Sequence, residues 1–322
     1  KIISAVDRSP HHAIYVKGNM SGYLSDHARL FKYFCKQIGI YGADAEHNGV
    51  SGYFCELLII NYKTFENVLK AISKLDFGSC IDVEDLVDEE EAKKKFTDAM
   101  IVIDPVDRNR NVGSPLSAQN FLRLKLEAEK YLKTGKFPVM KKVAKNLLIE
   151  KLKDKRETNF AGIKFRPPEI IAENLYPQIR KLANRMNGYL EENDFSVVRY
   201  SSWTDETKNA FIIFEMENKR LSKFKKQEGP SIFSKEVNHF LSKYIGGKYK
   251  PYIRNNKFFV DSERKFLNVE TAIRYFLKDN KKEIPQKIAE KSILVIKEKE
   301  IIEEVNKNKE FNAYLVGKYF EI

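Results

Sequence analysis

The chain has 322 residues, 43% of them hydrophobic, which is enough to fill a core in each of two domains. Its three cysteines, Cys35, Cys55 and Cys80, match no metal-binding spacing, and no apolar run is long enough for a membrane span, so the composition predicts a cytoplasmic, multi-domain globular protein without a disulfide framework. Residues 1–140 carry 19 basic and 19 acidic side chains, whereas residues 141–322 carry 38 and 26, so the whole net charge of +12 lies in the second half.

The first elements that the sequence predicts are a strand and a helix. The chain begins at Lys1 rather than Met, inside a segment that predicts a strand from Ile2 to Val6, and we therefore expect residues upstream of it. A helix follows, with Ser25 as the candidate N-cap and Gly39 as its end, because Phe31, Phe34 and other apolar residues recur at helical spacing.

The rest of the first half predicts more helices and few strands. The uniformly apolar segment 51–62 reads as a buried helix, and 64–75 as an amphipathic helix that Thr64 caps. Residues 82–91 are strongly acidic and are interpreted as a solvated loop. A short strand ends at Pro105, and a helix over 116–135 closes at Gly135. This half is therefore predicted to be a mostly helical domain.

The second half predicts a different architecture. The basic segment 139–157 contains neither Gly nor Pro and is interpreted as a helix that bridges two domains, with the boundary near residue 140. A strand, a helix and two strands are then expected at residues 159–165, 173–193, 195–203 and 208–218. This order suggests half of a ferredoxin-like βαββ layer. Basic helices at 232–245 and 269–279 alternate with aromatic strands in the remainder.

The uneven charge bears on function. A basic domain beside a neutral one is typical of proteins that bind the phosphate backbone of nucleic acids, although a lysine-rich solubilising surface gives the same composition. Aromatic residues alternate with basic ones over residues 243–259, a pattern that suits stacking on bases as well as ordinary β packing. Together these features favour RNA as a partner.

No carboxylate group in the sequence has the spacing of a two-metal catalytic site. Gly78 and Ser79 precede Asp82, Glu84 and Asp85 by too few residues to hold the helix that separates such motifs in polymerase-β-like domains. Asp104 and Asp107 flank a proline turn and are interpreted as turn formers. The sequence therefore predicts no metal site in this chain.

Other residues are better suited to a nucleotide. His11 and His12 are expected in a loop after the opening strand, within reach of phosphates, although such histidines commonly face solvent. Lys32 and Tyr41 could line a cleft beside that strand, or be a surface lysine and a core ring. Arg110 could present its donors to a phosphate or a base edge, or be solvated.

Taken in order, these segments resemble the archaeal, class I CCA-adding enzymes, the tRNA nucleotidyltransferases that build the 3′ CCA end. The similar segments are AVDRSPHH, RLFKYFCKQIGIYGA, VSGYFCELLIINY, IDPVDRNRNV and IKFRPPEIIAENLYPQIRKL, at residues 5–12, 29–43, 50–62, 103–112 and 163–182. Similarity extends over nearly the whole chain and is closest up to about residue 200. Five motifs in the same order are far more specific than any one of them.

The resemblance implies an α+β fold of several domains. Residues 1–22 would be a remnant of the nucleotidyltransferase head, and residues 23–140 a helical nucleotide-binding domain like that of poly(A) polymerases and oligoadenylate synthetases. Residues 141–322 would form a ferredoxin-like, tRNA-binding domain with a helical tail. The Gly-Ser turn and the carboxylates that hold Mg²⁺ in the family would lie upstream of Lys1, so the chain alone is expected to be inactive.

Site residues follow from the same motifs. Lys32 falls on the family's triphosphate-binding lysine and Tyr41 on the tyrosine that contacts the triphosphate. Arg110 falls on the arginine that reads the base edge of CTP or ATP together with tRNA backbone phosphates. His12 falls on the nucleotide-binding histidine, with His11 as a one-residue alternative.

Two further residues, Arg8 and Ser9, match the motif at the floor of the cleft. The function implied is the addition of C, C and A to tRNA from CTP and ATP, with the basic half holding the acceptor and TΨC arms by shape. A homodimer is compatible with the sequence. Two alternatives stay open: a non-catalytic RNA-binding chain that acts with a separately encoded head, and a poly(A) polymerase-like enzyme.

Overall fold

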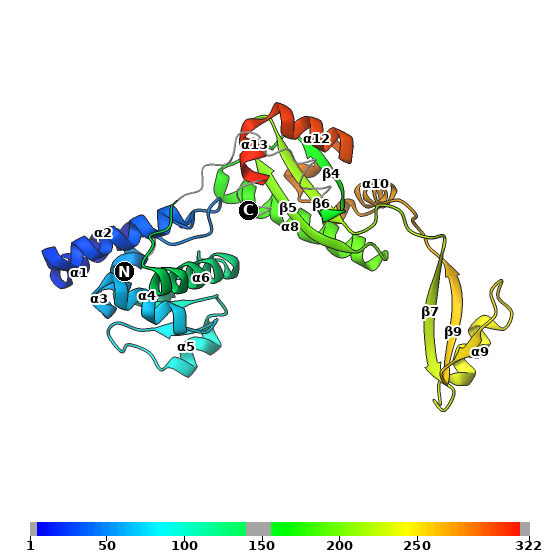
Figure 1. Ribbon diagram of the computed structural model, residues 1–322, viewed down its shortest axis with the longest axis horizontal. Coiled ribbons are helices and arrows are strands. Elements are labelled where there is room, and N and C mark those ends of the chain that lie inside the picture. Colours follow the sequence, from blue (N-terminus) through cyan, green and yellow to red (C-terminus); the bar gives the residue numbers. More distant parts are fainter. Residues whose placement is uncertain (1–4, 140–155, 316–322) are drawn as a thin grey trace. The chain divides into compact units, whose positions relative to one another are not determined.

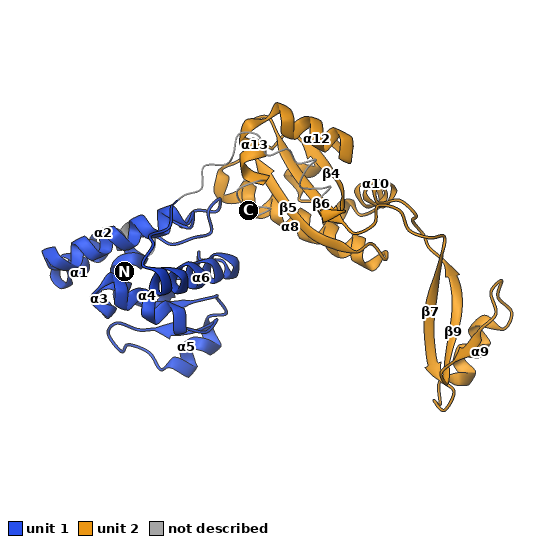
Figure 2. Cartoon of the chain, in the orientation of Figure 1, with its two compact units in different colours: residues 1–142 blue, residues 143–322 orange. Residues whose placement is uncertain are grey.

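The structure, a computed structural model, describes residues 5–139 and 156–315 and divides the chain into two compact units, residues 1–142 and 143–322 (Figures 1 and 2). The bridging helix expected at 139–157 lies almost entirely outside the described residues. None of the helices within the described ranges combines the length and the hydrophobicity that crossing a membrane requires.

The first unit is a helical domain with a small sheet. Its helices are α1 (Ala5–Asn19), α2 (Gly22–Gln37), α3 (Gly52–Tyr62), α4 (Phe65–Lys74), α5 (Glu89–Lys95) and α6 (Ala118–Thr134). Its strands, in sheet order, are β1 (Cys80–Ile81), β2 (Ile101–Asp104) and β3 (Asp107–Asn111). Buried faces of α2, α3, α4 and α6 share one core, in which α3 is apolar throughout because it is covered on most sides.

Three predicted features of this unit were wrong. Ala5 and Val6 belong to a helix and not to a strand, because a short apolar run does not distinguish the two. Helix α2 begins earlier than expected: Ser21 caps it by accepting from the Leu24 amide, whereas the Ser25 hydroxyl donates to the Ser21 carbonyl. The acidic stretch 82–91 is only partly loop.

The acidic stretch ends in a helix that its charges favour. Asp88 caps α5 by accepting from the Glu91 amide. Glu89, Glu90 and Glu91 form the first turn, and lysines at 93–95 form the last, so both ends carry the charge that the helix dipole stabilises.

The second unit contains a ferredoxin-like layer, as predicted. The strands β4 (Asn159–Phe165), β5 (Val197–Thr204), β6 (Ala210–Met216) and β10 (Ile293–Lys297) pair antiparallel in the order β10-β4-β6-β5. The first strand thus lies between the last and the third, which is the arrangement of a βαββαβ unit.

Helices cover both faces of this sheet (Figure 1). On one face, α8 (Ala172–Glu192) and α10 (Val269–Asp279) pack with α11 (Gln286–Ala289), after the short 3₁₀ turn η1 (Lys281–Glu283). On the other face, α12 (Glu298–Lys307) and α13 (Lys309–Tyr314) cover Phe160, Phe211 and Ile213. The rings of Phe211 and Phe311 stack there, 4.3 Å apart.

A separate three-stranded module interrupts the layer between β6 and α10. It consists of β7 (Phe224–Ser231), α9 (Val237–Tyr244), β8 (Tyr252–Arg254) and β9 (Lys257–Glu263), with sheet order β7-β9-β8. The two connections to the layer are paired, since the Leu221 amide donates to the Leu267 carbonyl (2.8 Å) and the Arg264 amide to the Lys223 carbonyl (2.8 Å). We call residues 222–265 the inserted module.

Candidate functional site

A buried carboxylate stands where β2 ends. Ile101, Val102 and Ile103 anchor β2 in the core, and this places the side chain of Asp104 at 0% exposure. Pro105 ends the strand, and the amide of Val106 donates to Asp104 Oδ1 (3.1 Å), which closes the turn toward β3. Asp104 is therefore a turn former, as predicted, but its other contacts go beyond that role.

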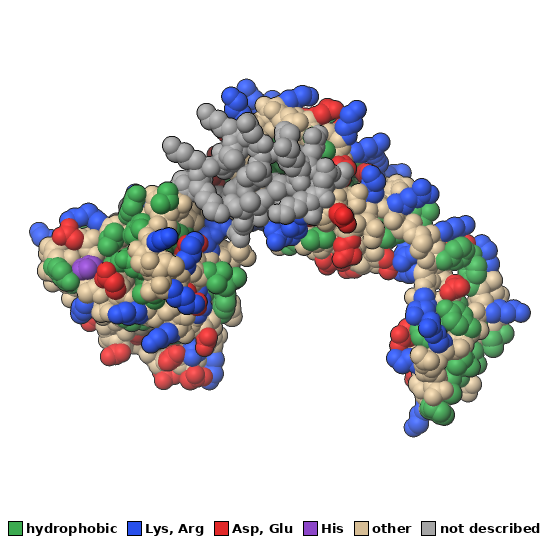
Figure 3. Space-filling view, viewed as in Figure 1, with side chains coloured by type: hydrophobic (Ala, Val, Ile, Leu, Met, Phe, Trp, Pro, Cys, Tyr) green, Lys and Arg blue, Asp and Glu red, His purple; other side chains and the backbone are tan. Residues whose placement is uncertain are grey.

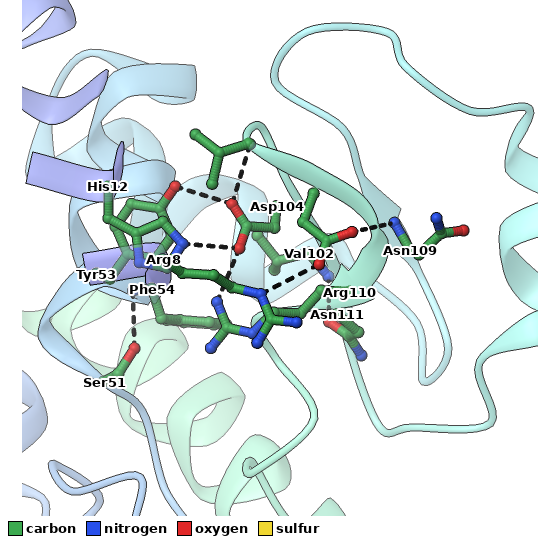
Figure 4. Close-up of polar contacts among 12 residues, drawn as sticks. Arg8, His12, Ser51, Tyr53, Phe54, Val102, Asp104, Asn109, Arg110 and Asn111 are labelled. Atoms are coloured by element: carbon green, nitrogen blue, oxygen red, sulfur yellow. Dashed lines mark hydrogen bonds and ion pairs between the residues drawn. The ribbon is translucent and has the colours of Figure 1, made fainter. Parts of the chain in front are cut away.

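Three side chains from three different elements converge on Asp104 (Figure 4). Its Oδ2 accepts from Arg110 Nη1 on β3 (2.8 Å) and lies 2.9 Å from His12 Nε2 on α1. Its Oδ1 accepts from the hydroxyl of Tyr53 on α3 (3.1 Å). We call Asp104, His12, Tyr53 and Arg110 the Asp104 cluster.

The cluster keeps its carboxylate ionised. Burial by itself would raise the pKa of Asp104, but hydrogen bonds from Arg110, from the Val106 amide and from His12 outweigh this and hold the pKa below its ordinary value. Burial together with the adjacent Asp104 charge raises the pKa of Tyr53, so its hydroxyl stays protonated and donates.

His12 lies on a helix and not in the expected loop. It is half-buried, and its ring stacks on that of Tyr53 with centroids 4.0 Å apart and an interplanar angle of 21°. His11, on the next position of α1, is exposed, and so is Ser9. Arg8 pairs with Asp107 at the start of β3 (3.1 Å). Of the two histidines, only His12 belongs to the Asp104 cluster.

A buried amide fixes the hairpin that carries Arg110. Asn111 Oδ1 accepts from the amides of Val102 and Gly113, each at 2.7 Å, and its Nδ2 donates to Asp98 and to the Met100 carbonyl. Because these bonds hold β3 against β2, the Arg110 side chain leaves the hairpin at a fixed place. The side chain is 36% exposed, so part of the guanidinium is accessible from outside the cluster.

A second group of polar residues surrounds the start of α3. Lys32 Nζ on α2 pairs with Glu56 on α3 at 2.6 Å. A β-carbon built on Gly52 would lie 3.2 Å from the Tyr41 hydroxyl and 3.6 Å from Lys32 Nζ, so both side chains reach over the first residue of the helix. The first turn of α3 holds no acidic residue. A helix N-terminus beside a lysine and a hydroxyl is suited to binding an anion.

A tight backbone pairing positions Tyr41. The Gly42 amide donates to the Val50 carbonyl (3.0 Å), the Gly49 amide to the Gly42 carbonyl (2.8 Å), and the Val50 amide to the Ile40 carbonyl (2.9 Å). A β-carbon at Gly49 would lie only 1.8 Å from the Ile40 carbonyl oxygen, so only glycine allows this approach. Lys36 Nζ lies 4.9 Å from the centre of the Tyr41 ring.

The two groups meet at α3, because Gly52 underlies Lys32 and Tyr41 while the next residue, Tyr53, belongs to the Asp104 cluster. The structure thus brings His12 and Arg110 together and, beside them, Lys32 and Tyr41. Sequence reasoning did not single out Tyr53 or Glu56. A tyrosine at the start of an apolar helix has the pattern of a core residue, and nothing in its spacing distinguishes it.

Three carboxylates that the sequence offers as metal ligands, those of Asp82, Asp104 and Asp107, are engaged by other groups. Asp104 and Asp107 are paired with cationic or imidazole groups, and Asp82 accepts from the amides of Glu84 and Val87. Asp44, Glu46 and His47 lie close enough to share an ion, with their ligand atoms within 4.8 Å of one another. Asp44 and Glu46 are exposed, and Asp44 and His47 already bond to each other.

Comparison with known proteins places the chain in a class. Residues 26–140 match the family model described as the second domain of tRNA nucleotidyltransferases, and residues 156–299 match the one described as the C-terminal domain of CCA-adding enzymes. The two domains stand in this order along one chain, and together they define it as a tRNA nucleotidyltransferase-type protein.

The similar proteins are CCA-adding enzymes from archaea. The chain is 36% identical to that of Methanocaldococcus jannaschii over 276 residues, which cover 84% of this chain and 60% of the relative. It is 31% identical to that of Picrophilus torridus over 281 residues (86% and 62%) and 30% identical to that of Archaeoglobus fulgidus over 282 residues (85% and 62%). The chain belongs to the family of CCA-adding enzymes, and it spans about 60% of the length of these relatives.

Proposed function

We propose that this chain supplies the nucleotide-recognising and tRNA-binding parts of a CCA-adding tRNA nucleotidyltransferase. The enzyme would add C, C and A in turn to an immature tRNA 3′ end, with CTP and ATP as donors and pyrophosphate as the product. The observation that carries the proposal is the convergence of His12, Arg110, Lys32 and Tyr41 around the start of α3 in a chain with both family domains.

Each residue has a distinct task in this proposal. Lys32 and Tyr41, over the N-terminus of α3, would neutralise and position the triphosphate. Arg110, held on one side by Asp104, would offer its free donors to the base edge. His12 would contact the nucleotide beside them. Positioning of this kind lowers the barrier because the reacting groups no longer need to find each other in solution.

The second unit would bind the tRNA. Lys and Arg side chains spread over the inserted module and the sheet layer on the face seen in Figure 3. Several lysines of this unit lie over aromatic rings, such as Lys226 over Phe259 (4.6 Å) and Lys265 over Tyr275 (4.2 Å). Such surfaces contact RNA through its backbone and 2′-hydroxyls, and this suits recognition of the acceptor and TΨC arms by shape.

Nucleotidyltransferases of this family generally use Mg²⁺, which supplies charge stabilisation when bound. Because the carboxylates of Asp82, Asp104 and Asp107 are engaged by other groups, we propose that a polymerase-β-like head domain holds Mg²⁺. A cytoplasmic location, which the composition predicts, and a homodimer, with which the sequence is compatible, are further parts of the proposal.

The test is incorporation of labelled CTP and ATP into tRNA lacking CCA. The assay compares the chain alone with the chain plus a separately supplied polymerase-β-like head domain. Activity that requires both proteins would support the proposal. Activity of the chain alone would mean that its own carboxylates are catalytic, and Asp82, Asp85, Asp104 and Asp107 would be replaced first. Binding of tRNA without nucleotide addition in either mixture would favour a non-catalytic RNA-binding chain.

Replacing Arg110 separates nucleotide recognition from tRNA binding. We predict that Arg110→Ala weakens binding of CTP and ATP by about ten- to hundredfold, since it removes charge-assisted hydrogen bonds, and leaves tRNA affinity unchanged. Arg108, exposed on the same strand, is the matched control. Equal losses of nucleotide and tRNA binding in Arg110→Ala would contradict a base-reading role.

A further inference from the structure

We propose that Asp104 is a positioning residue that sets the choice of base without touching the nucleotide. It would do so by fixing the direction of the Arg110 guanidinium and the tautomer of His12. This inference rests on the proposed function, because it concerns how the same site tells CTP and ATP from UTP and GTP.

The carboxylate of Asp104 has no capacity left for a ligand. Its two oxygens offer about four acceptor sites. Arg110 and His12 share Oδ2, and Tyr53 and the Val106 amide share Oδ1. The side chain is also fully buried. Asp104 therefore acts on the nucleotide only through the groups that it holds.

Holding Arg110 by one nitrogen gives the guanidinium a direction. The group is planar and donates only, so once Nη1 is bonded to Asp104 the remaining donors have a set orientation. Cytosine and adenine present an acceptor ring nitrogen next to their amino group, whereas uracil and guanine carry a hydrogen on the corresponding nitrogen. A fixed fork of donors favours the first pair and repels the second. An unanchored arginine could turn away from the mismatch.

Asp104 also decides which nitrogen of His12 carries the hydrogen. The ionised carboxylate only accepts, so His12 Nε2 must donate across the 2.9 Å contact. The stacked ring of Tyr53, whose hydroxyl donates to the same carboxylate, prevents the imidazole from rotating out of this contact. In the neutral ring, Nδ1 is then an acceptor of fixed direction.

The first experiment measures these two properties in the full chain without nucleotide. Nitrogen-15 NMR of the wild-type chain should show the His12 hydrogen on Nε2 and slowed rotation of the Arg110 guanidinium. In Asp104→Asn the new amide donates toward His12, so the hydrogen should move to Nδ1 and Arg110 should rotate freely. A wild-type His12 with its hydrogen on Nδ1, or unchanged signals in the variant, would overturn the proposal.

The second experiment measures base choice in the reconstituted addition assay. Asp104→Asn should lower the ratio of kcat/KM for CTP over UTP, and for ATP over GTP, by about ten- to hundredfold, with the KM for tRNA unchanged. Asp205→Asn is the matched control, because Asp205 also has a lowered pKa but caps a turn in the second unit. A retained ratio in Asp104→Asn would show that Asp104 is merely structural.

A gentler variant keeps the proposal testable should Asp104→Asn fail to fold. Tyr53→Phe removes one hydrogen bond to Asp104 and leaves the ring that stacks on His12 and the Arg110 contact in place, so we expect a smaller loss of base choice and a His12 hydrogen that stays on Nε2. A loss of base choice as large as that of Asp104→Asn, or a His12 hydrogen on Nδ1, would contradict the role given to Asp104. If the wild-type mixture adds no nucleotides, the proposed function fails, while the NMR result still decides whether Asp104 positions these side chains.

Discussion

The charge of Lys32 is already compensated in the free chain. Its ammonium lies 2.6 Å from Glu56, and the two side chains are 24% and 23% exposed. A triphosphate arriving at the start of α3 would compete with this carboxylate for the lysine. Glu56 would therefore weaken the binding of an anion while keeping Lys32 extended along the surface of the helix.

Replacing Glu56 tests this competition. We predict that Glu56→Gln tightens the binding of CTP and ATP by up to about fivefold, because a partly exposed ion pair contributes at most about 1 kcal/mol. The gain should shrink at high salt. Titration calorimetry measures it, with Glu66→Gln at the exposed start of α4 as the control. Weaker binding in Glu56→Gln would instead mean that Glu56 orients Lys32 for the phosphate.

The pKa of Asp104 gives a stability prediction with a definite sign. His12, Tyr53 and Arg110 face this carboxylate from α1, α3 and β3. The folded pKa lies below the ordinary value of about 3.9, so the ionised form stabilises the fold above that pH, and this contribution is lost as the pH falls through the folded pKa.

Asp104→Asn should therefore lower the free energy of unfolding by about 2 kcal/mol at neutral pH, a reduced figure because Arg110 is partly exposed. The difference from wild type should stay constant down to about pH 5 and narrow below about pH 4. Urea unfolding at several pH values measures it. Asp26→Asn, in an exposed pair with Arg29, should change little at any pH. If the difference in free energy of unfolding between wild type and Asp104→Asn grew as the pH fell, the pKa of Asp104 could not be lowered in the folded chain.

Single residues of the site were predictable only in part. The motif positions gave His12, Lys32, Tyr41 and Arg110, and their roles as nucleotide ligands stay predictions. Asp104 has the pattern of a turn residue because its proline follows at once, and its contacts with α1 and α3 depend on tertiary packing. Residues that join distant segments leave no local pattern, so this cluster could not be found without a structure.

At the scale of elements, two glycines near the start of α3 have different surroundings. Gly49 lies in the loop before the helix, and Gly52 is the first residue of the helix. Gly49 meets the backbone of Ile40, so a methyl group there has nowhere to go. Gly52 begins α3 and meets only the ends of the Tyr41 and Lys32 side chains. Gly49 is therefore required by the fold, whereas Gly52 leaves room for the side chains of Tyr41 and Lys32 above the helix.

Alanine at these two positions should separate stability from binding. Gly49→Ala should cost several kcal/mol, roughly 3, because the Ile40–Val50 pairing must open. Gly52→Ala should leave stability unchanged or raise it by up to about 1 kcal/mol, since alanine favours helix, yet weaken triphosphate binding by displacing the Tyr41 hydroxyl. Thermal unfolding and CTP binding measured on both variants decide this. Loss of stability in Gly52→Ala would contradict the assignment.

Elements with strong local signals were predicted well. The helices at 51–62, 64–75 and 116–135 were predicted from their apolar residues, from Thr64 as a cap and from Gly135 as an end, and the structure shows that Ser51 and Ser117 cap the other two. The start of α2 was predicted wrongly because two serines, Ser21 and Ser25, could each cap the helix. Helix α5 was missed because a run of acidic residues is also typical of a solvated loop. The pairing of β10 with β4 joins segments far apart in the chain, so no local pattern predicts it, and only the βαββ order of the elements suggested a ferredoxin-like layer.

At the scale of the whole molecule, the charge is concentrated where a sheet layer carries an insertion. The inserted module, residues 222–265, contains 11 of the 38 basic residues of the second half but only 4 of its 26 acidic ones. Its two connections are paired to each other and tied by Lys225 and Arg264 to Asp194. The layer itself closes through β10-β4-β6-β5 without it.

Removing the inserted module should therefore weaken tRNA binding while sparing the layer. With Leu221 and Phe266 joined by a short glycine-serine turn, we expect the β10-β4-β6-β5 sheet to persist, because none of its strand pairs involves the module. Affinity for tRNA lacking CCA should fall, and the slope of log affinity against log salt should become shallower by about 0.9 for each phosphate that the module neutralises. Binding of CTP, assigned to the first unit, provides the control. An unchanged salt slope with an intact sheet would place the tRNA-binding surface elsewhere in the second unit, because counterion release follows only the charges that meet phosphate.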